Sequence, residues 1–298
     1  MYPAVIEDYV APHTLNEALQ AFGQFGAGET LCIAGGMSLM QALKSRLVRP
    51  KRLIDLRHVA DLKGVRTGTD GVFIGAMTRY VDLAAEAKLH GAYQALNDAA
   101  IHIGDRQVRN RGTIGGSLCW NYLAACCPPV VLALGATLEL ARTDGRGGRQ
   151  TRTLAAESFL KTPLETARAS DEILLSIKLP SPAKNAGSAY RKWGLVTDAL
   201  PVIGVAVYVE LDASGTCQNA RIAIGGLASG PRRAATAEKV LVGARATDGD
   251  KIAAALARAS QEIQVQADLW ADQDYRRFLI RDLGQQAAKI AFQRAQGG

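Results

Sequence analysis

The sequence predicts an α+β protein built from two parts, and three observations support this prediction. In the first half, short apolar runs typical of strands alternate with amphipathic helical stretches. From Asp171 onward the chain holds alternating apolar segments typical of half-buried strands, and after Pro231 it becomes helical. The length of 298 residues allows about two domains, with enough apolar residues for a sizeable core.

The first segment, residues 1 to about 57, is predicted to form a small βαβ-like unit. Thr14 and Glu17 fit a capping box, which marks the start of a helix with an apolar face. Arg52 to Leu56 is the last strand expected in this unit. The helix is predicted to bury Leu15, Ala18, Leu19 and Phe22.

A first glycine loop follows the strand expected at Leu31 to Ala34. Gly35 and Gly36 let a ligand approach the bare main chain, and Ser38 with Gln41 fits a second capping box. Free main-chain N–H groups at the start of the next helix favour a phosphate or pyrophosphate. A plain tight turn is the alternative. The inner face of this helix is predicted to carry Leu39, Met40, Leu43 and Leu47.

A second glycine loop spans Arg109 to Ser117. Gly112, Gly115 and Gly116 are expected to supply exposed main-chain donors, so that the two loops clamp a phosphate from two sides. A side chain at Gly35 or Gly116 would then occupy ligand space or force strain of about 1–3 kcal/mol. Neither a G-x-G-x-x-G fingerprint after a strand nor a G-x-x-x-x-G-K-[ST] loop is present, so a bound dinucleotide requires another design.

The remaining elements divide the chain into two domains. We expect residues 1–177 to form one domain, with subdomains of about 1–57 and 58–177, and residues 178–298 to form the other. The second subdomain is predicted to contain a strand at Val72 to Ala76, helices near Val81, Leu96 and Pro128-Pro129, and a hairpin turning at Asp144-Gly145. The second domain is predicted to contain strands at Ser188 to Trp193, Pro201 to Leu211 and Cys217 to Ile224, and helices at Asp250 to Ile263 and Asp274 to Gln293, the last with Phe278, Leu279, Leu283, Ala287 and Ile290 on one side.

Composition excludes several classes of function. Five cysteines without a C-x-x-C pair argue against a disulfide framework, and four scattered histidines lack metal-ligand spacing, so we predict no metal in this chain. A net charge of +7 is compatible with nucleic-acid binding, but only 6% of residues are aromatic, which favours a solvated face or a protein interface. Without a signal peptide or an apolar run of about 18 residues, we expect a cytoplasmic protein that does not span a membrane.

Five short motifs, taken in order, resemble a known family. They are Ala34-Gly35-Gly36-Met37-Ser38, Ile74-Gly75-Ala76-Met77-Thr78, Arg109-Asn110, Thr113-Ile114-Gly115-Gly116 and Pro231-Arg232. With these motifs the chain is similar to the FAD-binding medium subunits of molybdenum hydroxylases, such as carbon monoxide dehydrogenase and xanthine dehydrogenase. The resemblance covers nearly the whole chain, and the two glycine loops together are more specific than either alone.

The resemblance implies a two-subdomain FAD-binding domain of the vanillyl-alcohol-oxidase (PCMH) type, then a C-terminal α+β domain of the CO dehydrogenase flavoprotein type. It also implies non-covalent FAD. The residues implied to bind FAD are Cys32, Ile33, Ala34, Gly35, Gly36, Met37, Ser38, Leu39, Ile103, Thr113, Ile114, Gly115, Gly116, Ser117, Leu174, Lys192 and Leu200. Without the resemblance, Ile103 and Leu174 are expected to be core residues and Lys192 a surface charge. Cys126 stands where relatives usually have an aspartate near the cofactor's sugar region.

The resemblance further implies an electron-transfer subunit. Such a chain assembles with a large molybdopterin-binding subunit and a small [2Fe–2S] subunit, as a heterotrimer or a dimer of heterotrimers, and passes electrons to an external acceptor. We find no triad, metal-ligand set or paired carboxylates in a glycine-rich setting, so no catalytic residue is predicted and the chemistry is assigned to the cofactor. The alternatives are a stand-alone PCMH-type flavin oxidase or reductase and a non-catalytic basic scaffold whose glycine loops are only turns.

Overall fold

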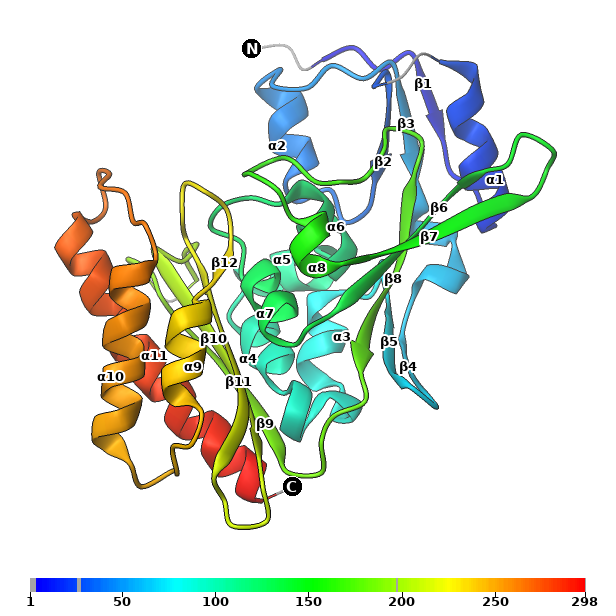
Figure 1. Cartoon of the computed structure of the whole chain (residues 1–298). Coiled ribbons are helices and arrows are strands. Elements are labelled where there is room, and N and C mark those ends of the chain that lie inside the picture. The colour runs from blue at the N-terminus through cyan, green and yellow to red at the C-terminus, as the bar shows by residue number, and fades with distance from the viewer. Residues whose placement is uncertain (1–3, 26–27, 197, 298) are drawn as a thin grey trace.

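The computed structural model describes residues 4–25, 28–196 and 198–297, and within them the strands form three sheets (Figure 1). The mixed α and β architecture expected from the sequence is confirmed. The expectation that the chain lacks a signal peptide in part concerns residues 1–3, which lie outside the described residues. No helix in the described ranges combines the length and the apolar character that crossing a bilayer requires.

The first sheet is small and parallel, with strand order β1-β3-β2. Figure 1 shows one helix on each side of it. The capping box of Thr14 and Glu17 forms as predicted, and the apolar face that follows it is buried. The elements are β1 (Asp8–Val10), α1 (Leu15–Gln20), β2 (Thr30–Ile33), α2 (Leu39–Lys44) and β3 (Arg52–Asp55).

The capping box predicted at Ser38 and Gln41 is wrong. Helix α2 does begin after Ser38, but that residue already has helical backbone angles (φ −91°, ψ −45°), and its side chain caps no N–H group. A capping side chain reaches back to the helix only from an extended backbone. The predicted inner face is also partly wrong, since Met40 of α2 is exposed. Leu47 is exposed too, because α2 ends at Lys44 and Leu47 lies beyond it.

The second sheet has five antiparallel strands in the order β4-β5-β8-β6-β7. Strand β8 lies at its centre. The half-buried alternation predicted for β8 is wrong, because Ile173 and Leu175 enter the core beneath the first sheet while Leu174 and Ile177 enter the core of the second. The strands are β4 (Val65–Gly68), β5 (Gly71–Gly75), β6 (Thr137–Thr143), β7 (Arg149–Ala155) and β8 (Ile173–Pro180).

Short helices between β5 and β8 position the second glycine loop. The predicted helices near Val81, Leu96 and Pro128-Pro129 and the hairpin of β6 and β7 are confirmed. The helices are α3 (Tyr80–Ala85), α4 (Ala95–Ile101), α5 (Arg106–Arg111), α6 (Ile114–Trp120), α7 (Cys127–Ala133) and α8 (Ala156–Phe159). Single 3₁₀ turns lie at η1 (Ala21–Gln24), η2 (Leu56–His58), η3 (Ala60–Leu62), η4 (Ala87–Leu89) and η5 (Gly91–Tyr93).

The third sheet is antiparallel, with order β12-β11-β10-β9. Three helices cover one of its faces, and α4 and α7 contact the other (Figure 1). The predicted strands and helices are confirmed, but Phe278 is exposed and stacks on Tyr275 instead of facing the core. The elements are β9 (Ala186–Trp193), β10 (Ile203–Leu211), β11 (Cys217–Gly225), β12 (Arg232–Arg233), α9 (Ala235–Leu241), α10 (Gly249–Glu262) and α11 (Gln273–Gln296).

An ion pair ties the last helix to α4. Arg294 of α11 donates from Nη1 and Nη2 to the two carboxylate oxygens of Asp98, at 2.7 and 2.9 Å. The same carboxylate accepts the main-chain N–H of Tyr190 at 3.0 Å, and Arg294 also donates to the carbonyl of Ser188 at 2.7 Å. One carboxylate therefore fixes α4, β9 and α11 relative to one another.

Candidate cofactor site

A cavity of about 280 Å³ lies beside the two glycine loops, between α2, α6, β8 and the segment that leads into β10. Its volume is close to the lower end of the range of ligand pockets. All but two of the residues predicted to bind FAD line it. The exceptions are Ile33, which packs with Leu39 and Leu53, and Ile114, which is fully buried in the core of the second sheet.

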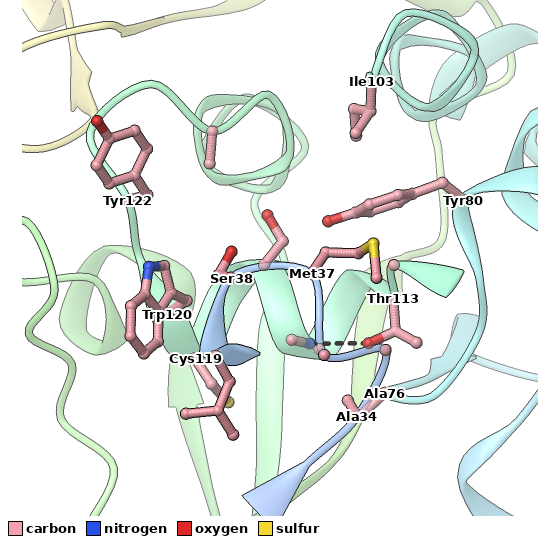
Figure 2. A pocket seen from close by; sticks show the side chains of 18 of the residues that line it. Ala34, Met37, Ser38, Ala76, Tyr80, Ile103, Thr113, Cys119, Trp120 and Tyr122 are labelled. Carbon is pink, nitrogen blue, oxygen red and sulfur yellow. Dashed lines mark hydrogen bonds between the residues drawn. The ribbon is translucent and has the colours of Figure 1, made fainter. Parts of the chain in front are cut away.

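The first glycine loop presents main-chain donors that have no acceptor. The N–H groups of residues 35 to 39 make no hydrogen bond to any other group in the described part of the chain. The turn is closed one residue later, where the N–H of Met40 donates to the carbonyl of Gly36 at 3.0 Å, and Gly36 has a φ of +77°. Figure 2 shows Met37 and Ser38 of this loop in the middle of the pocket. The loop therefore has the chemistry of an anion site.

The second glycine loop does not supply the exposed donors that we predicted. The N–H of Gly115 donates to the carbonyl of Ala76 at 2.8 Å, that of Gly112 to Val108 at 2.7 Å, and that of Gly116 to Oγ1 of Thr113 at 3.1 Å (Figure 2). The bond of Gly115 fastens the loop to the segment after β5, while those of Gly112 and Gly116 cap helices α5 and α6. The two loops thus have different roles, since the first offers donors and the second forms a wall.

Glycine is required at two positions of the glycine loops, because there the main chain touches the main chain of another segment. A Cβ on Gly35 would lie 2.6 Å from the carbonyl carbon of Arg111 and 2.9 Å from Cα of Gly112. A Cβ on Gly115 would lie 2.5 Å from the carbonyl oxygen of Ala76. Of the two effects predicted for a side chain at Gly35 or Gly116, strain is the one that these contacts support, because both positions face protein atoms and not ligand space.

Three side chains of the wall are acidic or basic. Lys192 donates from Nζ to the carbonyl of Ala199 at 2.7 Å. Glu172 is buried and receives two hydrogen bonds from Arg152, at 2.6 and 2.8 Å, and one from the N–H of Ala169 at 2.7 Å. Burial alone would raise the pKa of Glu172, but the bonds from Arg152 and Ala169 outweigh it and hold the pKa below its usual value. The third side chain is Arg168.

We predict that Glu172→Gln lowers the free energy of unfolding at neutral pH but not in acid. The folded pKa of Glu172 lies below its ordinary value of about 4.3, so the stabilisation is complete above that value and disappears as the pH falls through the folded pKa. Urea unfolding at about pH 7 and at the lowest pH where the protein stays folded measures the difference. Glu157→Gln, at an exposed glutamate, is the control. An equal loss at both pH values would contradict the prediction.

Several wall residues were missed by sequence reasoning. Tyr80, Trp120 and Tyr122 line the cavity, and Figure 2 shows Trp120 and Tyr122 on one side of it and Tyr80 with Ile103 on the other. Tyr80 lies two residues after the Ile74-Gly75-Ala76-Met77-Thr78 motif, and Trp120 ends the helix that begins in the second loop, so position along the chain was the available signal. Arg168 lies in a polar loop without any motif.

The thiols of the wall are neutral. Burial raises the pKa of Cys32 to about 12, and it also raises the pKa of Cys119 and of Cys126. A neutral thiol is a poor nucleophile and a poor metal ligand. Across the described ranges no group of three or more His, Cys, Asp or Glu side chains is arranged to hold a metal ion.

Comparison with known proteins identifies the family. Residues 4–182 match the family model of the FAD binding domain in molybdopterin dehydrogenase, and residues 188–291 match that of the CO dehydrogenase flavoprotein C-terminal domain. The chain belongs to the FAD-binding medium subunits of molybdenum hydroxylases. The suspected resemblance is thus confirmed, and with it the two-part fold of this FAD subunit.

Relatives of the FAD subunit match it over nearly their whole length. The 6-hydroxypseudooxynicotine dehydrogenase complex subunit alpha of Paenarthrobacter nicotinovorans is 30% identical and covers 97% of this chain and 95% of its own. The carbon monoxide dehydrogenase medium chain of Hydrogenophaga pseudoflava is 31% identical, covering 96% and 97%. A solved structure of carbon monoxide dehydrogenase from Hydrogenophaga pseudoflava has a TM-score of 0.89 at 32% identity, covering 99% of each chain.

The cofactor of this FAD subunit is FAD, and the cavity fits it. A pyrophosphate is an anion that needs several donors, and the unpartnered N–H groups of residues 35 to 39 provide them. Arg168 and Lys192 add positive charge to the wall. The apolar side chains of Ile103, Leu174 and Leu200 supply surface for a flat aromatic ring.

Proposed function

We propose that this chain is the FAD-carrying electron-transfer subunit of a molybdenum hydroxylase complex. The observation that carries the proposal is the set of unpartnered N–H groups in the first glycine loop, facing a cavity in a chain of this family. Bound FAD supplies the exchange of electrons. The protein binds and orients it, and contributes no nucleophile, since the wall thiols are neutral.

We assign the binding roles by the geometry of the wall. The N–H groups of residues 35 to 39 hold the pyrophosphate, with Cys32 and Ala34 beside them. Thr113 and Ser117 close the cavity from α6. Lys192, with its ammonium fixed by the carbonyl of Ala199, places a positive charge at the other end of the cavity. These assignments, including those of Ile33 and Ile114 through their main chains, remain predictions.

We further propose that the partners are a large molybdopterin-binding subunit and a small [2Fe–2S] subunit, in a heterotrimer or a dimer of heterotrimers. Electrons enter from the clusters of the small subunit and leave to an external acceptor. The relatives support a complex, because one is named as a subunit of a dehydrogenase complex and others are named as medium chains. The cytoplasm is the proposed compartment, and five free thiols suit its reducing conditions. The domain boundary between residues 177 and 178 also remains a prediction.

We predict that the purified chain is yellow, with FAD that acid or heat releases. It should gain substrate-dependent dye reduction only when produced with its molybdenum and iron–sulfur partners, because no metal-holding group is formed by the described residues. Flavin spectra and size-exclusion chromatography of the chain, produced with and without the proteins that neighbouring genes encode, test both statements. A colourless folded chain that takes up no FAD would favour the scaffold, and a monomer that oxidises a substrate alone would favour the stand-alone flavoenzyme.

A further inference from the structure

Arg168 reaches the cavity from a loop that is held by the helix of the second glycine loop. Asn121, at the end of α6, is fully buried and has a left-handed backbone (φ 44°, ψ 48°). Its Nδ2 donates to the carbonyls of Thr162 and Glu165, both at 2.9 Å. Its main-chain carbonyl accepts the N–H of Leu164 at 2.9 Å. The loop after α8 therefore has a fixed position relative to α6.

The guanidinium of Arg168 is anchored on one side only. Its Nη1 donates to the carbonyls of Ala169 and Glu172, at 2.9 and 2.8 Å. Its Nε and Nη2 have no acceptor among the described residues. The nearby carboxylate of Glu172 is already bound by two nitrogens of Arg152. Arg168 is thus oriented by the protein while two of its nitrogens remain available.

The charge of Arg168 lies near the strand that enters the first glycine loop, because Arg168 bonds the carbonyl of Glu172, and the next residue, Ile173, belongs to the core cluster on which Cys32 packs. It lowers the pKa of Cys32, against the larger effect of burial, and it does the same to Cys119 of α6. The second cation of the wall lies elsewhere, because Lys192 acts instead on His102 and Cys126. Arg168 is therefore the cation on the Cys32 side of the wall, where the unpartnered N–H groups of residues 35 to 39 follow in the chain.

We propose that Arg168 is a phosphate ligand of the cofactor site, binding the pyrophosphate through Nε and Nη2 beside the N–H groups of the first loop. A planar guanidinium with two free nitrogens matches two phosphate oxygens. Arg168 then helps to set the preference for a flavin dinucleotide over a flavin without phosphate. This inference rests on the proposed FAD function and assigns a residue that the motifs do not include.

The test compares ligands with and without a pyrophosphate. The flavin is removed from the full-length chain, and the affinities for FAD, ADP and riboflavin are measured by fluorescence and calorimetry for the wild type, Arg168→Met and Arg168→Lys. We expect Arg168→Met to weaken FAD and ADP by about 10- to 100-fold, the range of a charge-assisted hydrogen bond, and to leave riboflavin unchanged. Arg168→Lys should recover part of the loss. Arg142→Met removes an arginine whose guanidinium bonds Gln150 on the hairpin, and should bind all three ligands normally.

Each possible result distinguishes phosphate binding by Arg168 from a purely structural role in its loop. Equal ADP affinity in the wild type and Arg168→Met would overturn the inference while the FAD function stands. A loss of riboflavin binding as large as the loss of ADP binding, or a lowered melting temperature in both Arg168 variants, would show that the residue only holds the loop, which also overturns it. A wild type that binds no FAD would refute the proposed function and this inference together.

Discussion

Replacing Gly35 with alanine is expected to remove nearly all FAD from the purified protein. The new Cβ would lie inside contact distance of the main chain at Arg111 and Gly112, and main-chain atoms cannot move aside as a flexible side chain can. The first loop would shift away from the second, and its unpartnered N–H groups would no longer face the cavity. We expect the ratio of flavin to protein to fall below about a tenth of the wild-type value, with strain of about 1–3 kcal/mol.

Two other glycines provide graded controls for this substitution. A Cβ on Gly116 would meet Oγ1 of Thr113 at 3.0 Å and Cβ of Ala34 at 3.6 Å, so Gly116→Ala should lose only part of the flavin. A Cβ on Gly249, in the first turn of α10, would meet nothing within 4 Å, and Gly249→Ala should be neutral. Absorbance at the flavin band, relative to protein, ranks the three. Normal FAD content in Gly35→Ala would show that the two loops do not depend on this contact.

Removing the carboxylate of Asp98 is expected to cause the largest loss of stability among single changes at the surface between α4 and α11. Asp98 and Arg294 are largely buried. Asp98→Ala would leave the N–H of Tyr190 without its acceptor, and the guanidinium of Arg294 with the carbonyl of Ser188 but no counter-charge. Breaking a buried pair from one side costs about 3 kcal/mol or more. Urea unfolding at neutral pH measures the change in the free energy of unfolding.

The matched control is an ion pair of the same residue types on the surface. Arg79 and Asp82 lie three residues apart at α3, and about half of each side chain is exposed. Asp82→Ala should therefore change the free energy of unfolding by less than about 1 kcal/mol. Similar losses in Asp82→Ala and Asp98→Ala would contradict the role assigned to the buried pair.

Local signals in the sequence predicted most elements, because their causes lie within a few residues. The box of Thr14 and Glu17, the prolines at the start of α7 and the hairpin that turns at Asp144-Gly145 each form as expected. The grouping of two distant glycine loops at one site could also be predicted from their shared glycine pattern, and the family resemblance made this prediction more specific. The start of α2 was predicted correctly, but its cap was not. The turn at Gly36 sets the backbone angles of Ser38, and in that conformation its side chain does not cap the helix.

The division of roles between the loops could not be predicted. The acceptor for Gly115 is the carbonyl of Ala76, and the atoms that require glycine at position 35 belong to Arg111 and Gly112. Such partners come from segments that only the folded chain brings together. Arg168 shows the same limit, because its position depends on the side chain of Asn121, which no short pattern connects with the loop it holds.

The central place of β8 has a consequence for the order of assembly during synthesis. Ile74 of β5 pairs with Ile177 of β8. This edge of β5 therefore stays unpaired until about 100 further residues have been synthesised, which takes roughly 5–20 s at ordinary rates of translation. An unpaired edge is a site of aggregation, and the nascent chain depends on chaperones or fast closure during this interval. The cavity wall is completed later still, at Pro201. The complete FAD cavity therefore becomes available only after all the strands of the second sheet have been synthesised.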